Sequence, residues 1–464
     1  MNAGMRNLVL AAVAAVVTSA GAVAVLTQPH DTTRKITGTG DAAPGLAWSV
    51  DAAATYGEAF AEFRDPAYGT EYDLGGAGFI DAGDTLVTVI GVSGDDMALR
   101  EPRMYGFDAD TGEQRWQAPA SDLGGCADVP VDGALICYTS VSAEEPAVIG
   151  YDLDSGAVTR TPVDWMVFAI AAVDDRVYLA EGDVESDDVR VHSGTLADPD
   201  AHWSRSFAMG TAWESLPFDA LDVTHGQGVF TLGADLAGFD LATGDPTWNA
   251  ELNGCSRTTT TSDALLLRVT TECDGYRITG TDLLDRTGRT LAATDRPGVH
   301  DLTLDLPTDD TIPVLIDDTA YDRRDGTVRW TSPDLVYTAP DSGEGAPAIR
   351  GAATAILGDI ALLQDHAAHT VSGLDLRTGQ RLWRTDSDGF ASARAWDTDI
   401  ALLTDTIGFR ALDPRTGETV WTAPFRAIDA DPDALTDNGE LTARSPGHFF
   451  FAAPRTMIAL RPLD

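Results

Sequence analysis

Basic residues are scarce in this sequence. It has 31 lysines and arginines against 73 aspartates and glutamates, Lys35 is its only lysine, and the formal net charge is −42. Such a surface repels phosphate backbones and anionic lipid headgroups, which argues against nucleic-acid binding. Solubility at high salt explains the charge without any partner. An acidic docking face for a basic or cationic partner is the alternative.

The usual signatures of catalysis are also absent. No glycine-rich phosphate loop follows a strand and opens a helix, and no Gly-x-Ser-x-Gly elbow occurs. The only close histidine pair, His366-Ala-Ala-His369, lies between strand-like runs without a third ligand nearby, so a metal site is not favoured. Asp108-x-Asp110 and Asp152-x-Asp154 lack a full calcium ligand series and fit hairpin capping better. We therefore predict no catalytic or metal-binding residue.

Cysteine is missing from the N-terminal region, since the first cysteine is Cys126. Residues 1–27 nevertheless read as a targeting segment, because Arg6 precedes an apolar run of about 19 residues, which is just long enough to span a bilayer. The run ends near Ala20-Gly21-Ala22, which is similar to a signal-peptidase site. Without a nearby cysteine, lipoprotein anchoring is excluded. An uncleaved anchor and a cleaved signal both stay open, and both predict an extracytoplasmic protein, membrane-anchored or secreted, with residues 28–44 as a flexible tether.

The four cysteines fall into two local pairs, Cys126/Cys137 and Cys255/Cys273. The turn-forming residues 130–133 lie midway between the first two, and residues 262–263 lie close to midway between the second two. Residues equally distant from a turn face each other on antiparallel strands, within reach of a disulfide. Because an exported compartment is oxidising, we predict two structural disulfides. A shared zinc site would need two separated hairpins to converge.

One pattern recurs through the sequence: aspartate, then glycine four residues later, then tryptophan after four more. Threonine precedes the glycine in four of the five copies, and aspartate takes its place in the fifth. The copies are Asp108, Gly112 and Trp116; Asp240, Gly244 and Trp248; Asp322, Gly326 and Trp330; Asp375, Gly379 and Trp383; and Asp413, Gly417 and Trp421.

The spacing of this pattern is that of a β-hairpin. The aspartate and threonine oxygens can accept or donate hydrogen bonds at the turn backbone, and glycine supplies a positive φ. Each copy follows a strand-like apolar run, and the returning strand carries the tryptophan inward, where its ring can fill the space between stacked sheets. Five copies at a constant offset predict a repeat architecture.

The repeat resembles the PQQ-type β-propeller repeat, which quinoprotein dehydrogenases share with the bacterial outer-membrane assembly scaffold BamB. The resemblance covers residues 45–464 and implies an all-β fold with a single propeller of four-stranded blades. It implies a binding or scaffold module for a protein or cell-envelope partner, which we expect to be monomeric. A quinoprotein-like oxidoreductase using PQQ and Ca²⁺ is the first alternative, and a sensor of an extracellular small ligand is the second.

The enzyme alternative is weakened by two further absences. Quinoprotein alcohol dehydrogenases carry a disulfide between adjacent cysteines, and this sequence has no Cys-Cys pair and no Cys-x-x-Cys-His haem motif. We therefore predict no cofactor and no PQQ-dependent dehydrogenase activity, and PQQ with Ca²⁺ stays open as the alternative. BamB itself is lipid-anchored through an N-terminal cysteine, so the missing cysteine also puts an identical role in doubt.

The ends of the sequence complement each other. Residues 46–50, with Trp48, look like the last strand of a repeat, and residues 457–461 look like the strand before it. We predict that the two pair and close the ring. Nine candidate units can be counted; because propellers usually have four to eight blades, we favour eight and keep nine open.

Two features stand outside the repeat. Residues 51–70 form an insertion in which Tyr56, Phe60 and Phe63 have helical spacing, which predicts a short covering helix. Three further tryptophans, Trp165, Trp213 and Trp396, do not occupy the motif position. They are either core residues or residues of a ligand-binding face, and the sequence does not choose between these roles.

Overall fold

The computed structural model describes residues 43–462 apart from several short segments. These segments are residues 72–74, 95–97, 183–187, 209–219, 224–225, 233–234, 252–254, 262–264, 272–277, 296–299, 336–350, 366–367, 388–391 and 432. The predicted targeting segment and tether, residues 1–27 and 28–44, lie outside the described residues except for the last two of the tether.

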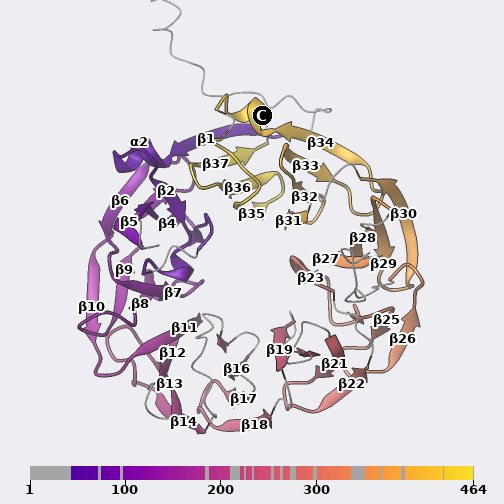
Figure 1. The fold of residues 1–464 in the computed structure, drawn as a ribbon, viewed down its shortest axis with the longest axis horizontal. Helices are drawn as coiled ribbons and strands as arrows, with labels where there is room; N and C mark the ends of the chain where they lie inside the picture. Colours follow the sequence, from indigo (N-terminus) through magenta and orange to yellow (C-terminus); the bar gives the residue numbers. More distant parts are fainter. Residues whose placement is uncertain are drawn as a thin grey trace, which may run out of the picture.

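The described residues form nine β-sheets arranged as blades around a central axis (Figure 1). In every blade except blade 9, the strand that comes first in the sequence lies nearest the centre and the last lies at the outer rim; in blade 9, β35 is innermost and β1 is outermost. The fold is therefore the predicted all-β propeller. The count of nine candidate units is confirmed, and the preference for eight blades was wrong, because the irregular units also form sheets.

Blades 1 to 3 occupy the first part of the ring. Blade 1 contains β2 (Glu62–Arg64), β3 (Ile80–Asp81), β4 (Thr85–Ser93), β5 (Leu99–Asp108) and β6 (Gln114–Pro119). Blade 2 contains β7 (Leu123–Cys126), β8 (Ala134–Thr139), β9 (Ala147–Asp152) and β10 (Val158–Pro162). Blade 3 contains β11 (Val167–Val173), β12 (Arg176–Gly182), β13 (Asp188–Gly194) and β14 (Trp203–Ala208).

Blades 4 to 6 continue the ring. Blade 4 contains β15 (Leu221–Asp222), β16 (Gln227–Leu232), β17 (Asp235–Asp240) and β18 (Pro246–Glu251). Blade 5 contains β19 (Cys255–Thr260), β20 (Leu266–Thr271), β21 (Ile278–Leu284) and β22 (Thr290–Thr294). Blade 6 contains β24 (Val314–Ile316), β25 (Thr319–Tyr321) and β26 (Val328–Thr331).

Blades 7 to 9 complete it. Blade 7 contains β23 (Leu304–Pro307), β27 (Ala352–Gly358), β28 (Ile360–Asp365), β29 (Thr370–Asp375) and β30 (Gln380–Asp386). Blade 8 contains β31 (Ser392–Trp396), β32 (Ala401–Thr404), β33 (Gly408–Leu412) and β34 (Thr419–Pro424). Blade 9 contains β35 (Glu440–Ser445), β36 (His448–Ala452), β37 (Thr456–Arg461) and β1 (Gly45–Asp51).

Blade 9 joins the two ends of the described chain. Strand β1 pairs antiparallel with β37, and Trp48 lies opposite Ala459. The predicted closure is confirmed. It removes the open edges that an unclosed array of blades would expose.

The hydrophobic core is divided among the interfaces between blades. Nine clusters of buried side chains are found in the described residues, and each spans two neighbouring blades. Because a middle strand is covered on both faces, its sequence is apolar almost throughout rather than alternating. Strand β4 is an example, since eight of its nine residues are buried.

Two parts of the fold differ from the expectations. Blade 6 has only three strands, because β23, which precedes it in the sequence, pairs parallel with β27 of blade 7 instead. The predicted covering helix is much shorter than the insertion: α2 (Ala52–Tyr56) ends at Gly57, which has a φ of 91°. Phe63 lies buried in a strand, and the helical spacing of the three aromatic residues was therefore misleading. A one-turn 3₁₀ helix, η1 (Pro66–Tyr68), and a short helix, α3 (Phe425–Ile428), are the other helical elements described.

Candidate functional site: the two faces of the ring

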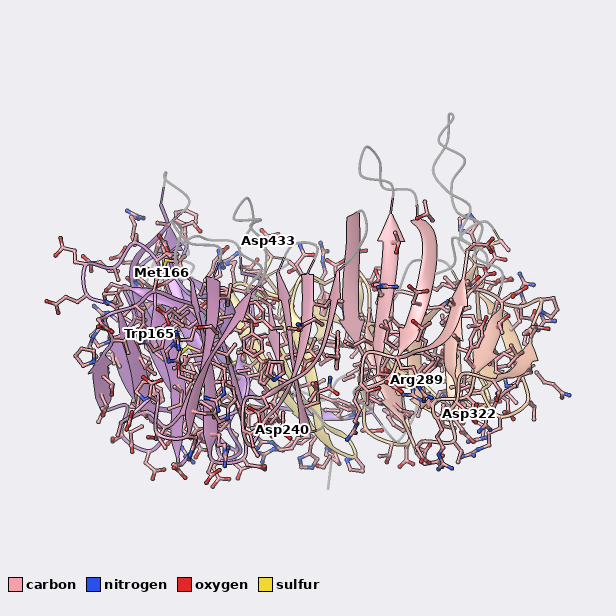
Figure 2. The ribbon with its side chains drawn as sticks, turned by 90° about the horizontal axis from the view of Figure 1, so that it is seen from below. Trp165, Met166, Asp240, Arg289, Asp322 and Asp433 are labelled. Carbon is pink, nitrogen blue, oxygen red and sulfur yellow. A yellow bond between two sulfur atoms is a disulfide. The ribbon has the colours of Figure 1, made fainter. Side chains whose placement is uncertain are left out.

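The two faces of the ring carry different kinds of loops. Strands alternate in direction within a blade, so all the Asp–Gly turns lie on the same face, which we call the motif face. Figure 2 shows Asp240 and Asp322 toward this side and Met166 and Asp433 toward the other, which we call the opposite face. Residue Gly45 pairs with Arg461, whose guanidinium donates to Asp110 in a motif turn of blade 1. The described chain therefore enters the ring at the motif face.

In each motif turn, the aspartate binds the backbone of the turn itself. The Asp108 carboxylate accepts hydrogen bonds from the backbone N–H groups of Asp110 and Thr111 at 3.0 and 2.9 Å, and from the Thr111 hydroxyl at 3.0 Å. Hydrogen bonds from the Arg115 guanidinium are the main reason that the pKa of Asp108 falls to about 2. The carboxylate thus caps a hairpin, as the spacing indicated.

The motif tryptophan contacts the next blade rather than its own turn. The Trp48 indole N–H donates to the Ala109 carbonyl, 3.1 Å away, in the motif turn of blade 1. Gly112 of that turn has a φ of 70°, and a Cβ there would lie 2.7 Å from the Trp48 ring. Glycine is therefore required at this position for two reasons: the backbone is left-handed, and the indole approaches too closely to leave room for a Cβ. We call this contact the interblade indole bond.

Six interfaces between blades have this bond. The donor and acceptor pairs are Trp48/Ala109, Trp116/Leu153, Trp203/Leu241, Trp248/Arg286, Trp330/Leu376 and Trp383/Pro414. In every pair the acceptor is the residue that follows the turn aspartate. The sequence repeat predicted that each indole ring packs between sheets. It did not predict that the indole N–H donates to a carbonyl oxygen of the next blade.

Three interfaces lack the bond among the described residues, and they fall at every third blade. Between blades 2 and 3 the tryptophan position is Arg160, which pairs with Asp122. Between blades 5 and 6 it is Leu291. Between blades 8 and 9 Trp421 is present and buried, but the corresponding turn of blade 9 is interrupted by the two ends of the chain. The ring is thus divided into three groups of three bonded blades.

The glycines of the other four motif turns also adopt a left-handed backbone. Their φ values are 72° at Gly244, 71° at Gly326, 71° at Gly379 and 75° at Gly417. In three of these turns the indole of the preceding blade leaves no room for a Cβ, which would lie 2.5 Å from Trp203 at Gly244, 2.6 Å from Trp330 at Gly379 and 2.4 Å from Trp383 at Gly417.

Gly326 departs from this arrangement. A Cβ at Gly326 would lie 2.1 Å from the backbone oxygen of Leu291, which stands where a motif tryptophan would be. The sequence pattern predicted only the positive φ of these five glycines, because the second requirement comes from the neighbouring blade. For Gly244, Gly379 and Gly417 that neighbour is an indole ring, and for Gly326 it is a strand backbone.

Aspartates of the motif face pair with arginines of the same and of neighbouring turns. Asp359 accepts from Arg415 of blade 8 at 2.7 Å and lies 3.6 Å from Arg377 of its own blade. Arg377 also pairs with Asp309 at 3.2 Å. These side chains are exposed, so each pair contributes little to stability. The pairs link neighbouring motif turns to one another.

The cysteine prediction falls partly within the described residues. Cys126 and Cys137 lie opposite each other on β7 and β8 and form a disulfide. Cys255 begins β19, and its backbone is paired with Thr271. Cys273 lies outside the described residues, so the second disulfide stays a prediction.

The opposite face carries exposed apolar side chains on irregular connections. Phe60 is 85% exposed and has a φ of 67°, and Ile407 is 70% exposed on the turn between β32 and β33. A bulky residue at positive φ is uncommon and is a reason to look for function.

His192 lies in a network of polar side chains within blade 3. The two ring nitrogens of His192 lie 2.6 Å from the Asp200 carboxylate and 2.9 Å from the Glu181 carboxylate, so the imidazole is held between two carboxylates. Trp165 stacks on the His192 ring, with centroids 4.0 Å apart. The histidine is buried, and its two nitrogens are both occupied within the protein. Trp165 is therefore a packing partner, whereas Trp213 lies outside the described residues.

Two buried carboxylates, Glu440 and Asp65, lie at the inner end of the interface between blade 9 and blade 1. Burial raises the pKa of Glu440 to about 8, although the backbone N–H of Phe79 donates to it at 2.7 Å and opposes the rise. Burial likewise raises the pKa of Asp65 to about 6. Gly78 lies between the two side chains, since a Cβ there would approach both. No sequence pattern marks these positions, because their proximity depends on the closure of the ring.

The remaining candidates do not form a site in the described part of the chain. No group of three or more metal-ligating side chains is found among the described residues. His366 lies outside them, and His369 has a φ of 52° in a turn. Trp396 packs against the turn at Gly358. No described helix is long and apolar enough to cross a membrane, and the predicted targeting segment was not part of that search.

Comparisons with known proteins agree with this fold. The family described as outer membrane protein assembly factor BamB matches residues 45–273 and 317–397. No curated protein matches the chain. Solved structures that match this chain include BamB from Moraxella catarrhalis, at 19% identity over 72% of this chain and 81% of that one, with a TM-score of 0.35.

Two further structures show the range of this similarity. The computationally designed Ika8 protein has 11% identity over 86% of this chain and 99% of its own, with a TM-score of 0.44. The dihydro-heme d1 dehydrogenase NirN, in complex with DHE, has 10% identity over 78% of this chain and 73% of its own, with a TM-score of 0.40.

Proposed function

Because the chain belongs to the family described as outer membrane protein assembly factor BamB, we propose that it is an extracytoplasmic scaffold that binds a protein partner of the cell envelope. The N-terminal segment 1–27 holds it at a membrane or exports it. The propeller supplies a broad and rigid platform, and the connections between strands supply the contacts.

One observation carries this proposal: the repeated polar residues are engaged inside the fold. The Asp108 carboxylate is bound to its own turn, and the Trp116 indole is bound to the next blade. The same holds for the equivalent residues in other blades, such as Asp240 and Trp248. The repeat therefore builds the platform and leaves recognition to the residues that differ between blades.

The opposite face is the better candidate for binding the partner. The tether joins the ring at the motif face, since Gly45 pairs with Arg461 there. A ring held from that side presents its other face away from the membrane. Phe60 and Ile407 expose apolar surface on that side, and exposed apolar groups favour association when they are buried by a partner.

The test is capture of envelope proteins by the full-length chain and by the variant Phe60→Asp/Ile407→Asp. We expect the parent to retain a discrete partner and the variant to lose it. Val328→Asp is the matched control, because Val328 is also exposed, at 58%, but lies on the outer strand of blade 6. Equal capture by all three proteins would contradict the assignment of the opposite face.

Salt and cofactor dependence separate this proposal from the enzyme alternative. Charge-driven association weakens as salt screens it, so capture that depends on the acidic surface falls between low and high salt. Absorbance titration with PQQ and Ca²⁺ is expected to show no binding. Reduction of a dye acceptor by an alcohol or a sugar, strictly dependent on added PQQ and Ca²⁺, would overturn the scaffold proposal.

A further inference from the structure

A β-bulge in blade 1 brings two arginines to the same face of the sheet. Arg103 of β5 lies opposite Ile90 of β4, and Arg100 lies opposite Val92. The two residues between Arg100 and Arg103 on β5 therefore lie opposite the one residue between Ile90 and Val92 on β4. Without the extra residue, positions three apart in a strand would point to opposite faces. The bulge instead directs both guanidinium groups toward the side of the blade that faces α2.

The bulge is held in place by Tyr56 of α2. The Tyr56 hydroxyl donates to the carbonyl oxygen of Glu101 at 2.9 Å, and Glu101 has a φ of 43°, in the region that non-glycine residues rarely adopt. The Arg103 guanidinium lies over the Tyr56 ring, 5.5 Å from its centroid. A cation–π contact of this kind fixes the guanidinium without using up its hydrogen-bond donors.

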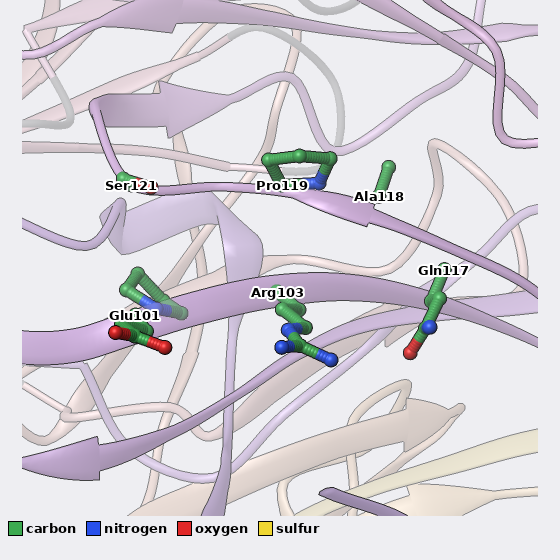
Figure 3. Close-up of a pocket in the computed structure, with 7 residues that line it drawn as sticks. Glu101, Arg103, Gln117, Ala118, Pro119 and Ser121 are labelled. Carbon is green, nitrogen blue, oxygen red and sulfur yellow. The ribbon is translucent and has the colours of Figure 1, made fainter.

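A groove opens beside these residues at the rim of the opposite face (Figure 3). It has a volume of about 400 Å³ and is lined on β5 by Glu101, Pro102 and Arg103. Gln117, Pro119 and Ser121 line it on the side of β6, the outermost strand of the blade. Arg103 lies between Glu101 and Gln117 along the groove. The volume lies within the range of ligand sites in proteins, roughly 300–1,000 Å³.

The groove carries a positive charge on Arg103. Arg100 and Arg103 are exposed and form no ion pair within the described residues, although carboxylates outnumber cations in the chain by 73 to 31. Farther along the same blade, Arg115 is paired with Asp108 at 2.6 Å. Arg103, which lines the groove and is fixed by an aromatic ring, is suited to a carboxylate, and Arg100 adds a second positive charge on the same face of the sheet.

Glu101 limits what the groove accepts. Its carboxylate lines the same groove and disfavours a second negative charge nearby, so a phosphate or a cluster of acidic residues fits poorly. A basic group beside the bound carboxylate would satisfy Glu101. Side chains two positions apart share a face of an extended chain, so one such chain can present both groups together.

We propose that this groove binds an extended peptide segment of the protein partner, with an acidic side chain against Arg103 and a basic side chain two positions away against Glu101. The inference rests on the proposed function, because it supplies the chemistry of the partner that the opposite face binds. Long-range repulsion between this acidic chain and an acidic side chain would be offset locally by a partner segment that carries both signs.

The experiment uses the full-length chain and labelled, blocked five-residue peptides with Glu and Lys two positions apart, in both orders. Binding is measured by fluorescence anisotropy. We expect at least one order to bind, Gln in place of Glu to weaken that peptide tenfold or more, and Arg103→Gln to have the same effect. Arg394→Gln is the matched control, because it removes the same charge from another exposed strand arginine and is expected to leave binding unchanged.

Three outcomes would overturn the inference: equal binding by the parent and Arg103→Gln, equal binding of the Glu and Gln peptides, or displacement of the peptide by acetate at the peptide's own concentration. The last would mean that a bare carboxylate is the ligand. If the parent and Arg103→Gln both capture an envelope partner but bind no peptide, the proposal of peptide binding in the groove is refuted and the scaffold proposal stands. If the peptide binds but no envelope partner is captured, the scaffold proposal is refuted and peptide binding in the groove stands.

Discussion

The indole N–H of Trp116 in blade 1 donates a 2.7 Å hydrogen bond to the carbonyl oxygen of Leu153 in blade 2. The same ring occupies the space where a Cβ at Gly156 would lie, 2.7 Å away. A repeat therefore reaches its final packing only when the following repeat has folded against it. Cooperativity between blades follows directly from this contact.

The hydrogen bond can be separated from the packing of the ring. Trp116→Phe keeps an aromatic ring and leaves the Leu153 carbonyl without its donor, which is expected to lower the free energy of unfolding by about 1–3 kcal/mol. Trp116→Ala also leaves a cavity and is expected to cost about 3–5 kcal/mol. Urea unfolding measures both. Val328→Ala, at an exposed position, serves as the control, and a Phe variant as stable as the parent would show that the bond contributes nothing.

The disulfide prediction has a thermodynamic consequence and a chemical one. The Cys126–Cys137 bond closes a loop with a sequence separation of 11. Replacing both residues by serine is expected to lower the free energy of unfolding by about 3 kcal/mol on the loop-entropy estimate. Non-reducing peptide mapping of exported protein is expected to recover this pair and Cys255–Cys273. A link between the two hairpins, or free thiols, would contradict the pairing.

Glu440 is expected to make stability depend on pH. Its pKa is about 8 in the folded protein, above the ordinary value of 4.5, so the folded state binds the proton more tightly than the unfolded chain. Its contribution is therefore fully present below pH 4.5 and is lost as the pH rises through about 8. Glu440→Gln is expected to flatten the fall in the urea midpoint between these values and to be more stable than the parent at a pH above about 8.

The control for this experiment is Glu113→Gln, because Glu113 lies in a motif turn at the surface. It is expected to leave the pH profile of the parent unchanged. Asp65 complicates the lower part of the range, since burial raises its pKa to about 6. A profile for Glu440→Gln that is parallel to that of the parent above pH 6 would rule out Glu440 as the cause.

Ring closure is expected to dominate the thermal stability. Removing residues 457–464 deletes most of β37, which pairs with both β1 and β36. The truncated chain is expected to melt at a sharply lower temperature, because it exposes two sheet edges and the clusters packed on either side of blade 9. Differential scanning calorimetry measures this, and an unchanged melting temperature would mean that the ring does not depend on its closure.

The sequence predicted what is local and repeated, and it failed where contacts depend on neighbouring blades. The turn at Asp108 and Gly112 could be predicted because its hydrogen bonds lie within a few residues. The bond between Trp48 and Ala109 joins residues 61 positions apart, and its partner depends on how two sheets pack. The separation between tryptophan and acceptor varies from 31 residues at Trp383 to 61 at Trp48, so no constant spacing in the sequence marked the partner.

The insertion before β2 shows why a periodic pattern can mislead. Tyr56 and Phe60 have helical spacing, but Gly57 ends the helix by adopting a left-handed conformation, and Asp51 marks its start by accepting from the Ala54 N–H. These capping residues outweigh the aromatic pattern. The groove beside Tyr56 could not be predicted, because the bulge at Glu101 depends on pairing with β4.

The interfaces without an interblade indole bond also determine how the whole ring can deform. If each group of three bonded blades moves as one body, the protein is a closed loop of three stiff arcs connected by three joints. A closed loop with three joints is a triangle, whose shape in its own plane is fixed by the lengths of its sides. A fourth joint would create a linkage that can shear. Under that condition, the placement of Arg160, Leu291 and Trp421 would leave the ring free to pucker out of its plane while the width of its central opening is maintained.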